Sequence, residues 1–414
     1  MKVDTTTGSA EHLREAMVEA IDRHFTDKGQ VLAAEIRQAL LAVPRHMYCP
    51  GTSLEEAYRH DHAVITDRRD GEDISSVSAA YLIAEMLDQA VSATGGLQGR
   101  HVLEIGSGGY NASLLAELVG ESGSVTTVDI DPKVTARAQE CLAAAGYDRQ
   151  VAVVCADAEY PIGRRSFDMI IVTAGAWDIP PAWREQLIEG GVLVVPLRTW
   201  GLTRSWALRR DGDRLVSHAG RQCGFVPVRG ASEHRMRYEE IADGVYLRLD
   251  EGQRIDSARA AALLAEDAET VWAGVSLPPR TALPDLDLWL ATRLSAERGQ
   301  FVVLSAQQSA VDAGTVRPSW RFGAPALLTD EALVYRSRLR WTDRRFDLGA
   351  TAHGHAAAAA AGRMVEHMRA WLEAGSPSPG LHVAPAGTPD GDLPKGTVLA
   401  KRHCRLVLTE GAPR

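Results

Sequence analysis

The apolar positions in the first part of the chain follow a helical period. Between residues 9 and 42 they recur three or four residues apart, which is the spacing of one face of an α-helix. Asp27-Lys28-Gly29 interrupts the pattern and Val43-Pro44-Arg45 ends it, so two helices are expected. The stretch 58–76 is polar and rich in charged and turn-forming residues, which predicts a loop. A third helix is expected over about 78–91.

In the middle of the chain, short apolar runs rich in β-branched residues alternate with helical stretches. Strands are expected over 101–105, 124–128, 151–154, 167–172 and 192–196. Strands that alternate with helices form βαβ units, in which the strands are parallel and the crossovers are right-handed. The predicted fold class is therefore α/β, with a doubly wound, Rossmann-like domain that follows N-terminal helices.

Beyond residue 198 the pattern changes to that of an α+β region. Asp211-Gly212-Asp213 separates two apolar runs, which is typical of a β-hairpin turn. The other elements expected here are strands over 245–249 and 301–304, helices over 256–268 and 356–374, and a Pro- and Gly-rich loop over 375–396. A chain of 414 residues exceeds one ordinary domain. Three parts are expected: 1–75, 76–205 and 206–414.

The composition disfavours several classes of protein. A formal net charge of -9 at pH 7 argues against a nucleic-acid-binding protein, which usually carries a basic excess. No apolar run approaches the roughly 20 residues that span a bilayer, and the first residues lack the pattern of a signal peptide. The cysteines are scattered and never spaced as CxxC, which disfavours disulfides and a zinc site. We expect a cytoplasmic protein that binds neither nucleic acid nor membrane.

A glycine-rich turn follows the first expected strand. The segment from Glu104 to Tyr110 ends that strand and opens a helix, and its glycines let a ligand approach the backbone closely. Asp129, about 20 residues further on, ends the next strand and can accept both ribose hydroxyls of an adenosine. Asp157 and Ala158 follow the third strand, where an acid or its neighbour can contact an adenine edge. This order favours a site for a dinucleotide or for S-adenosylmethionine.

The spacing within the turn distinguishes these two cofactors. A dehydrogenase turn has the spacing GxGxxG, whereas here Gly106-Ser107-Gly108-Gly109 follows an acid, Glu104, at the strand end. A carboxylate there suits a sulfonium ligand with an amino group better than a diphosphate. S-adenosylmethionine is therefore the expected cofactor. Its expected contacts are Glu104, Gly106, Ser107, Gly108, Tyr110, Asp129, Ile130, Asp157, Ala158 and Thr173.

A set of short motifs between about residue 43 and residue 197 carries a family resemblance: Val43-Pro44-Arg45, Ala57-Tyr58, Ser76-Val77-Ser78, 102–106, 167–174, Ile179-Pro180 and 186–191. In these motifs and in their order, the chain resembles the protein-L-isoaspartate O-methyltransferase family. In the family a Thr-Ile-Ser triplet places its serine near the reacting carboxylate. The resemblance implies that Ser78 takes this role and that Ser76 replaces the threonine, with Ser75 close enough to compete. It also implies a peptide or protein substrate.

The chain departs from the family pattern in three places. The glycine turn is one residue shorter than usual, and Ala80 stands where a proline is usual. The long C-terminal part, together with 223–230, resembles a divergent actinobacterial branch that occurs with ribosomally made peptide natural products such as lanthipeptides, lasso peptides and graspetides. That resemblance implies methylation of an aspartate in a modified precursor peptide, after which the ester closes to an aspartimide. In this case 206–414 is a candidate for peptide recognition.

Two other functions stay open. One is a repair enzyme that methylates isoaspartate in damaged proteins. The other is a peptide-binding protein that keeps the fold without turnover, which the intact Gly106, Gly108, Asp129 and Ser78 disfavour.

Two pairs of histidines raise the question of a metal site. His60-Asp61-His62 and His353-Gly354-His355 each place two imidazoles close in sequence, but neither has an obvious third ligand nearby. A metal is not expected at either pair. His60 and His62 precede Ser76 on the expected loop, so they are either substrate contacts or solvated loop residues.

The run 333–341 alternates between apolar residues and arginines, which is typical of a half-buried strand. Arg336, Arg338 and Arg340 share its polar face. One interpretation is a solvated face whose charges protect a sheet edge. The other is a cationic strip that holds an acidic peptide, by charge or by pairing as an added strand.

Overall fold

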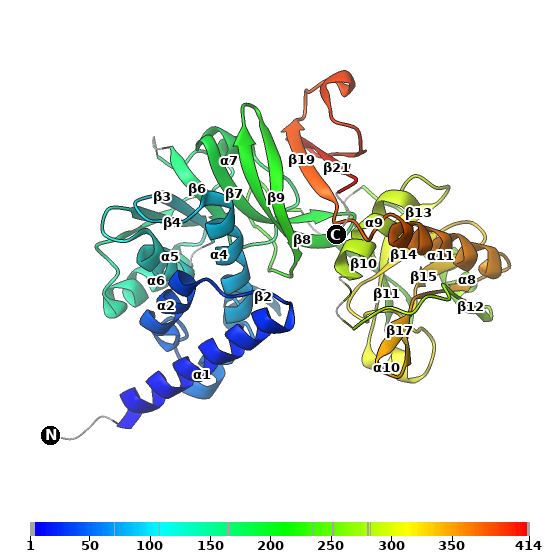
Figure 1. Cartoon of the computed structure of the whole chain (residues 1–414), viewed down its shortest axis with the longest axis horizontal. Helices are drawn as coiled ribbons and strands as arrows, with labels where there is room; N and C mark the ends of the chain where they lie inside the picture. The colour runs from blue at the N-terminus through cyan, green and yellow to red at the C-terminus, as the bar shows by residue number, and fades with distance from the viewer. Residues whose placement is uncertain are drawn as a thin grey trace.

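The structure is a computed structural model that describes residues 5–411, except residues 70, 107, 164–165, 235, 251, 280 and 282. Within these residues two large β-sheets, of ten and seven strands, organise the chain. Figure 1 shows them as the centres of two lobes. The N-terminal helices and the last three strands both belong to the first lobe, so the second lobe is inserted between them.

The N-terminal part combines helices with one hairpin. Its elements are α1 (Thr5–Asp27), α2 (Ala34–Ala42), the short η1 (Arg45–Tyr48), α3 (Leu54–Ala57), β1 (Val64–Arg69), β2 (Glu72–Val77) and α4 (Ala80–Thr94). The two helices expected before residue 43 are confirmed. The loop expected over 58–76 is wrong, because β1 and β2 pair antiparallel, with Val64 opposite Val77 and Arg68 opposite Asp73. Exposed polar residues, including the ion pair of Arg68 with Asp73, hide the strand pattern here.

The first sheet has the predicted crossovers in its parallel half. The elements are β3 (His101–Ile105), α5 (Tyr110–Val119), β4 (Ser124–Asp129), α6 (Pro132–Ala145), β5 (Val151–Cys155), β6 (Phe167–Val172), α7 (Pro181–Glu185) and β7 (Leu187–Thr199). The strands lie in the order β7-β6-β3-β4-β5, and each neighbouring pair is parallel. The winding therefore reverses between β3 and β6, and ligands of such sheets bind beyond the carboxyl ends of the strands at this point. The predicted α/β fold class is confirmed.

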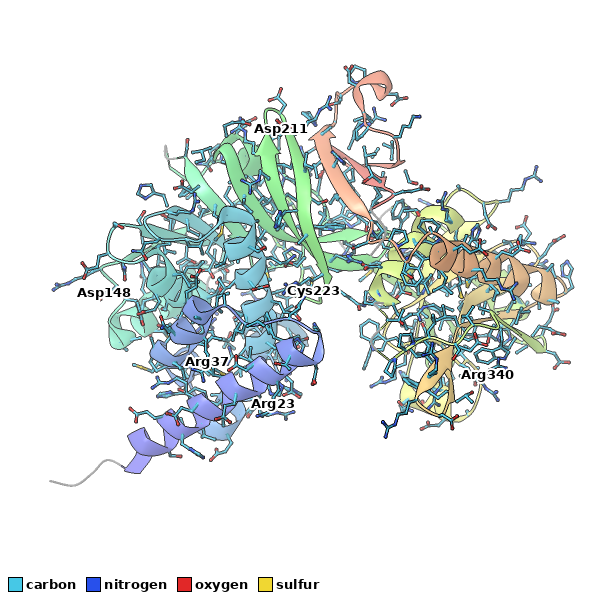
Figure 2. All side chains as sticks on the ribbon, in the orientation of Figure 1. Arg23, Arg37, Asp148, Asp211, Cys223 and Arg340 are labelled. Atoms are coloured by element: carbon cyan, nitrogen blue, oxygen red, sulfur yellow. The ribbon has the colours of Figure 1, made fainter. Side chains whose placement is uncertain are left out.

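An antiparallel ladder extends this sheet. Its elements are β8 (Leu202–Asp211), β9 (Arg214–Gln222), β19 (Gly380–Pro385), η2 (Asp390–Asp392), β20 (Thr397–Ala400) and β21 (Cys404–Thr409). The predicted hairpin turn is confirmed, since Asp211 pairs with Arg214, and Figure 2 labels Asp211 at its tip. The loop expected over 375–396 is wrong in part, because it contains β19. Residue 205 lies inside β8, so the sheet itself crosses the boundary expected there.

The second sheet and its helices form an inserted domain (residues 237–373). Its elements are β10 (Arg237–Ala242), β11 (Val245–Leu249), α8 (Ser257–Leu264), β12 (Ala268–Trp272), α9 (Leu283–Leu294), β13 (Gln300–Ala306), α10 (Gln308–Asp312), β14 (Ala324–Leu328), β15 (Leu333–Arg336), β16 (Arg340–Thr342), β17 (Arg345–Asp347), β18 (Gly349–His353) and α11 (Ala357–Glu373). The sheet order is β10-β11-β13-β14-β15-β18-β12, antiparallel throughout. Along β13, Phe301 and Val303 pack toward α9 and α11, and Val302 and Leu304 pack toward α8 and α10. The sheet is thus covered on both faces.

The half-buried strand expected over 333–341 is wrong. β15 ends at Arg336, and all four of its residues are buried. Arg336 contacts the buried carboxylate of Asp287 on α9, with Nε 2.6 Å from Oδ1 and Nη2 3.0 Å from Oδ2. Trp341, expected on the buried face, is exposed. The alternation does not mark two faces of one strand, because the chain leaves the sheet after Arg336 and starts a new hairpin.

Among the described residues, no three His, Cys, Asp or Glu side chains gather as metal ligands would. His353 is buried, and its ring contacts the Tyr335 hydroxyl at 3.3 Å and the Glu266 carbonyl at 3.1 Å.

Across all the residues that the structure describes, no helix combines the length and the apolar character needed to cross a bilayer.

Candidate active site

A pocket opens beyond the carboxyl ends of β3, β4 and β6, where the winding of the first sheet reverses. Residues at these strand ends line it together with the end of β2 and the segment 226–232. The pocket gathers all three predicted serines and nine of the predicted cofactor contacts: Ser75, Ser76, Ser78, Glu104, Gly106, Gly108, Tyr110, Asp129, Ile130, Asp157, Ala158 and Thr173. Ser107 lies outside the described residues. Residues far apart in sequence are therefore brought to one place.

The turn after β3 is closely packed against the end of β6. Gly106 has a φ of 103°, and a β-carbon there would lie 2.6 Å from the Thr173 hydroxyl oxygen. That hydroxyl is 3.1 Å from the carbonyl oxygen of Ile105 and 2.8 Å from that of Gly106. Thr173 thus holds the turn in the shape that forms the floor of the pocket.

Gly106→Ala is expected to lower the free energy of unfolding by about 1 to 3 kcal/mol, because alanine strains the positive φ and displaces Thr173. Gly108→Ala is the matched control, since the nearest atoms to its β-carbon would lie at 3.9 and 4.0 Å. Denaturant unfolding of both variants checks this expectation. Equal destabilisation of the two variants would contradict the steric account.

Glu104, at the end of β3, is buried at the wall of the pocket. Asn111 donates to its Oε1 at 2.9 Å, and Thr127 donates to its Oε2. Burial raises the pKa of Glu104 from 4.5 to about 7, the two hydrogen bonds oppose the rise, and the neighbouring Asp129 adds to it. Asn111 and Thr127 are neutral, so a cationic group of a ligand in the pocket would stabilise the ionised form of Glu104.

Affinity for S-adenosylhomocysteine, which keeps the amino group, is expected to rise roughly tenfold between about pH 6 and about pH 8. The cause is that the ligand ammonium favours ionised Glu104, whose pKa in the free enzyme is about 7. In the free enzyme the contribution of Glu104 to stability falls as the pH rises from 4.5 to about 7, because the unfolded chain ionises Glu104 first. Calorimetric titrations across this range measure the affinity. Glu104→Gln should flatten the profile, and an unchanged profile in that variant would contradict the assignment.

The segment 226–232 forms a wall of the pocket that the sequence did not predict. Two backbone hydrogen bonds, of 2.7 and 2.9 Å, pair it with Gly175 just after β6. The Ala231 amide donates to Oδ2 of Asp157 at 2.9 Å, which fastens the wall to the expected adenine side. The segment follows Cys223, which Figure 2 shows between the two lobes. It is neither helix nor strand, so no periodicity could have revealed it.

The three serines differ in the contacts of their hydroxyls. Ser75 is buried, and its oxygen accepts hydrogen bonds from Thr66 at 3.0 Å and from Arg137 at 2.8 Å. Ser78 lies between β2 and α4, and its hydroxyl makes no hydrogen bond within the described part of the chain. Ser76 pairs with Ile65 through the backbone of the hairpin. The hydroxyls of Ser76 and Ser78 both lack a hydrogen-bond partner within the described residues and are available to a ligand in the pocket, and the family resemblance implies that Ser78 takes the role.

Arg45 fixes the backbone next to Ser78. It is fully buried, and its guanidinium donates to the carbonyl oxygens of Ala57 at 2.8 Å and Val77 at 3.3 Å. The same guanidinium lies over the ring of Tyr110, 4.9 Å from its centroid. One buried cation thus positions both the serine segment and the helix that follows the glycine turn.

The predicted substrate contacts lie outside the pocket. His60 and His62 do not line the pocket. Their loop is nevertheless adjacent to it, since the Tyr81 amide on α4 donates to the His60 carbonyl at 3.1 Å. Their role in substrate binding stays a prediction. Arg336, Arg338 and Arg340 belong to the inserted domain, and none of the three lines the pocket.

Comparison with known proteins identifies the family. Residues 15–233 match the family described as Protein-L-isoaspartate(D-aspartate) O-methyltransferase (PCMT). The match covers more than half of the chain and includes every residue found to line the pocket. The chain belongs to this family. The resemblance seen in the sequence is thereby confirmed for the family, whereas the branch associated with peptide natural products stays a prediction.

Relatives within the PCMT family match over nearly their whole length. The Protein-L-isoaspartate O-methyltransferase of Methanopyrus kandleri is 35% identical over 223 residues, which are 52% of this chain and 91% of the relative. The enzyme of the same name from Korarchaeum cryptofilum is 34% identical over 215 residues, 49% of this chain and 92% of the relative. A solved structure titled protein-L-isoaspartate O-methyltransferase covers 89% of this chain and 96% of its own, with 20% identity and a TM-score of 0.48.

Membership in the PCMT family makes this chain an S-adenosylmethionine-dependent carboxyl O-methyltransferase. The pocket suits that cofactor, because buried Glu104 faces it with a raised pKa and Asp129 ends β4 where ribose hydroxyls are bound in such folds. The residues that would hold it are Glu104, the turn at Gly106, Asp129 and Asp157. The PCMT match ends before the inserted domain begins at Arg237.

Proposed function

We propose that this enzyme esterifies the α-carboxylate of L-isoaspartyl residues in peptides or proteins. The observation that supports the proposal is a cofactor-type pocket, inside the matched range, to which Ser78 presents a hydroxyl without a protein partner. The two relatives named above carry this activity in their names.

The reaction requires positioning rather than a base. An α-carboxylate has an unperturbed pKa of roughly 3.3 to 3.7 and is already ionised at neutral pH. The methyl group comes from bound S-adenosylmethionine, whose sulfonium makes it electrophilic. One carboxylate oxygen must be desolvated and held in line with the bond that breaks, and such positioning contributes roughly 7 to 11 kcal/mol in the best cases. The pocket walls of this chain supply that constraint.

A serine hydroxyl suits this task. Ser78 can donate one hydrogen bond that orients the carboxylate without adding a positive charge. A guanidinium in its place would stabilise the anion more than the transition state, in which the negative charge is partly lost. Arg137, one of the cations near this segment, instead donates to Ser75 and to the Thr66 carbonyl.

A second candidate is methylation of an aspartate side chain in a modified precursor peptide. The observation in its favour is the inserted domain, which lies outside the range that matches the family. Esterification would give the side-chain carbonyl a methoxide leaving group. The next amide nitrogen could then attack that carbonyl and close an aspartimide, with loss of methanol. The family match and the names of the relatives favour isoaspartate over this candidate.

Intact-mass analysis with three substrates side by side tests the proposal. The substrates are a short isoaspartyl peptide, its normal aspartyl isomer, and a modified precursor peptide encoded beside this gene, if one exists. The proposal predicts that the isoaspartyl peptide gains one methyl group and its isomer gains none. Methylation of the precursor alone, followed by loss of methanol as the imide forms, would overturn it in favour of the second candidate.

A further inference from the structure

The inserted domain carries an exposed surface on which arginines and aromatic side chains gather. Two runs of chain form this arginine–tryptophan surface: 317–322, between α10 and β14, and 338–344, between β15 and β17. The runs lie side by side, because the Arg338 amide donates to the Arg317 carbonyl at 2.7 Å. Figure 2 shows Arg340, from the second run, in the lower part of the second lobe.

The large aromatic side chains here are half exposed. Trp320 is 49% exposed, Phe322 51% and Trp341 55%. The rings of Trp320 and Phe322 meet edge to face at 5.6 Å, and the Arg321 guanidinium lies 3.7 Å from the centroid of Phe322. Aromatic residues and arginines are the side chains enriched at the centres of protein interfaces. Their exposure here therefore indicates a binding surface.

The charge of the same surface indicates the kind of partner. The two runs contain five arginines and one acid, Asp343, in a chain whose net charge is -9. Arg340 pairs with Asp347 at 2.6 Å. The other four arginines have no carboxylate within 4.0 Å among the described residues: Arg317, Arg321, Arg338 and Arg344. These guanidiniums can each bind a partner's carboxylate in bidentate fashion.

We propose that the arginine–tryptophan surface binds an acidic segment of the polypeptide substrate, outside the residue that is methylated. The proposal rests on the proposed function in taking a polypeptide as substrate. Aspartate-rich segments are complementary to this surface in charge, and the exposed aromatic rings can pack on the backbone and side chains of such a segment. A nucleic acid fits less well, because its many phosphates would meet the negative charge of the rest of the chain.

Methyl transfer to two tagged substrates tests the proposal with the full-length enzyme. Both are isoaspartyl peptides, one with an N-terminal extension of glutamates and glycines and one with glutamines in place of the glutamates. The test variant is Arg317→Gln with Arg344→Gln. The matched control is Arg254→Gln with Arg298→Gln, two exposed arginines of the inserted domain outside this surface. KM, kcat and the Kd of the fluorescent peptides are measured, with thermal unfolding as the check on folding.

The proposal predicts that the test variant raises the KM and Kd of the acidic-tagged peptide about tenfold, with kcat unchanged. The neutral-tagged peptide and the control variant should show no change. Equal KM for the two peptides in the wild-type enzyme would overturn the proposal, as would tighter binding of single-stranded DNA at this surface. Self-association that the test variant abolishes would assign the surface to a second copy of the chain. If neither peptide is methylated, the proposed function fails, while the Kd values still decide the role of the surface.

Discussion

Replacing Ser78 with alanine is expected to lower kcat/KM for methyl transfer roughly 100-fold while S-adenosylmethionine still binds. The loss follows because the Ser78 hydroxyl, unlike that of Ser75, has no hydrogen-bond partner within the described residues, and the resemblance to the family implies that Ser78 rather than Ser76 orients the carboxylate. The groups expected to hold the cofactor, chiefly Glu104, Asp129 and the turn at Gly106, line the same pocket and are unchanged in this variant. Steady-state kinetics with an isoaspartyl peptide, together with calorimetric titration of S-adenosylhomocysteine, separates the two effects.

Ser75→Ala is the matched control for this expectation. Its oxygen accepts hydrogen bonds from Thr66 and Arg137, so its loss should loosen the β1–β2 hairpin and cost about 1 kcal/mol of stability, with a smaller effect on kcat/KM. Normal turnover in Ser78→Ala combined with an inactive Ser75→Ala would contradict the account and assign the role to Ser75.

Asp287→Ala is expected to lower the free energy of unfolding of the inserted domain by about 3 to 5 kcal/mol. The carboxylate of Asp287 contacts the guanidinium of Arg336 through two short contacts, and both residues are buried between α9 and the second sheet. Removing the carboxylate leaves a buried cation without its counterion, which is more costly than losing the contact itself. Denaturant unfolding followed by tryptophan fluorescence measures the change.

The double variant Asp287→Leu with Arg336→Met supplies the control. Apolar side chains of similar volume often replace a buried ion pair at little cost, so the double variant should recover most of the stability lost in Asp287→Ala. Equal destabilisation of the single and double variants would show that packing at this place, rather than the unpaired charge, dominates.

The gathering of residues from the ends of β3, β4 and β6 at one pocket could be predicted because its signals are local in sequence. The turn from Glu104 to Tyr110 and the acid at Asp129 each stand at the end of a strand with a clear apolar pattern, and the parallel topology brings such ends together. The place of Thr173 in the pocket could be predicted from the same rule, because Thr173 directly follows the end of β6. β3 and β6 are buried on both faces, which makes their apolar runs nearly continuous and easy to recognise.

The parts that sequence could not predict depend on contacts between distant segments. Whether Arg336 is solvated or buried is decided by Asp287, which lies 49 residues away on α9. The wall formed by 226–232 is placed by Gly175 and Asp157 rather than by any pattern of its own. β19 has buried Leu381 but lies in a stretch rich in Pro and Gly, so its composition indicates a loop. In each case a tertiary partner overrides the local signal.

The most direct test of the central claim is the fate of the methyl group that the enzyme transfers to an isoaspartyl peptide. The enzyme is incubated with S-adenosylmethionine labelled in the methyl group, and the modified peptide is then treated with mild base. A carboxyl methyl ester releases its label as volatile methanol, and this is the result that the account predicts. A label that resists base would mean that nitrogen or another atom accepts the methyl group, and it would contradict the account.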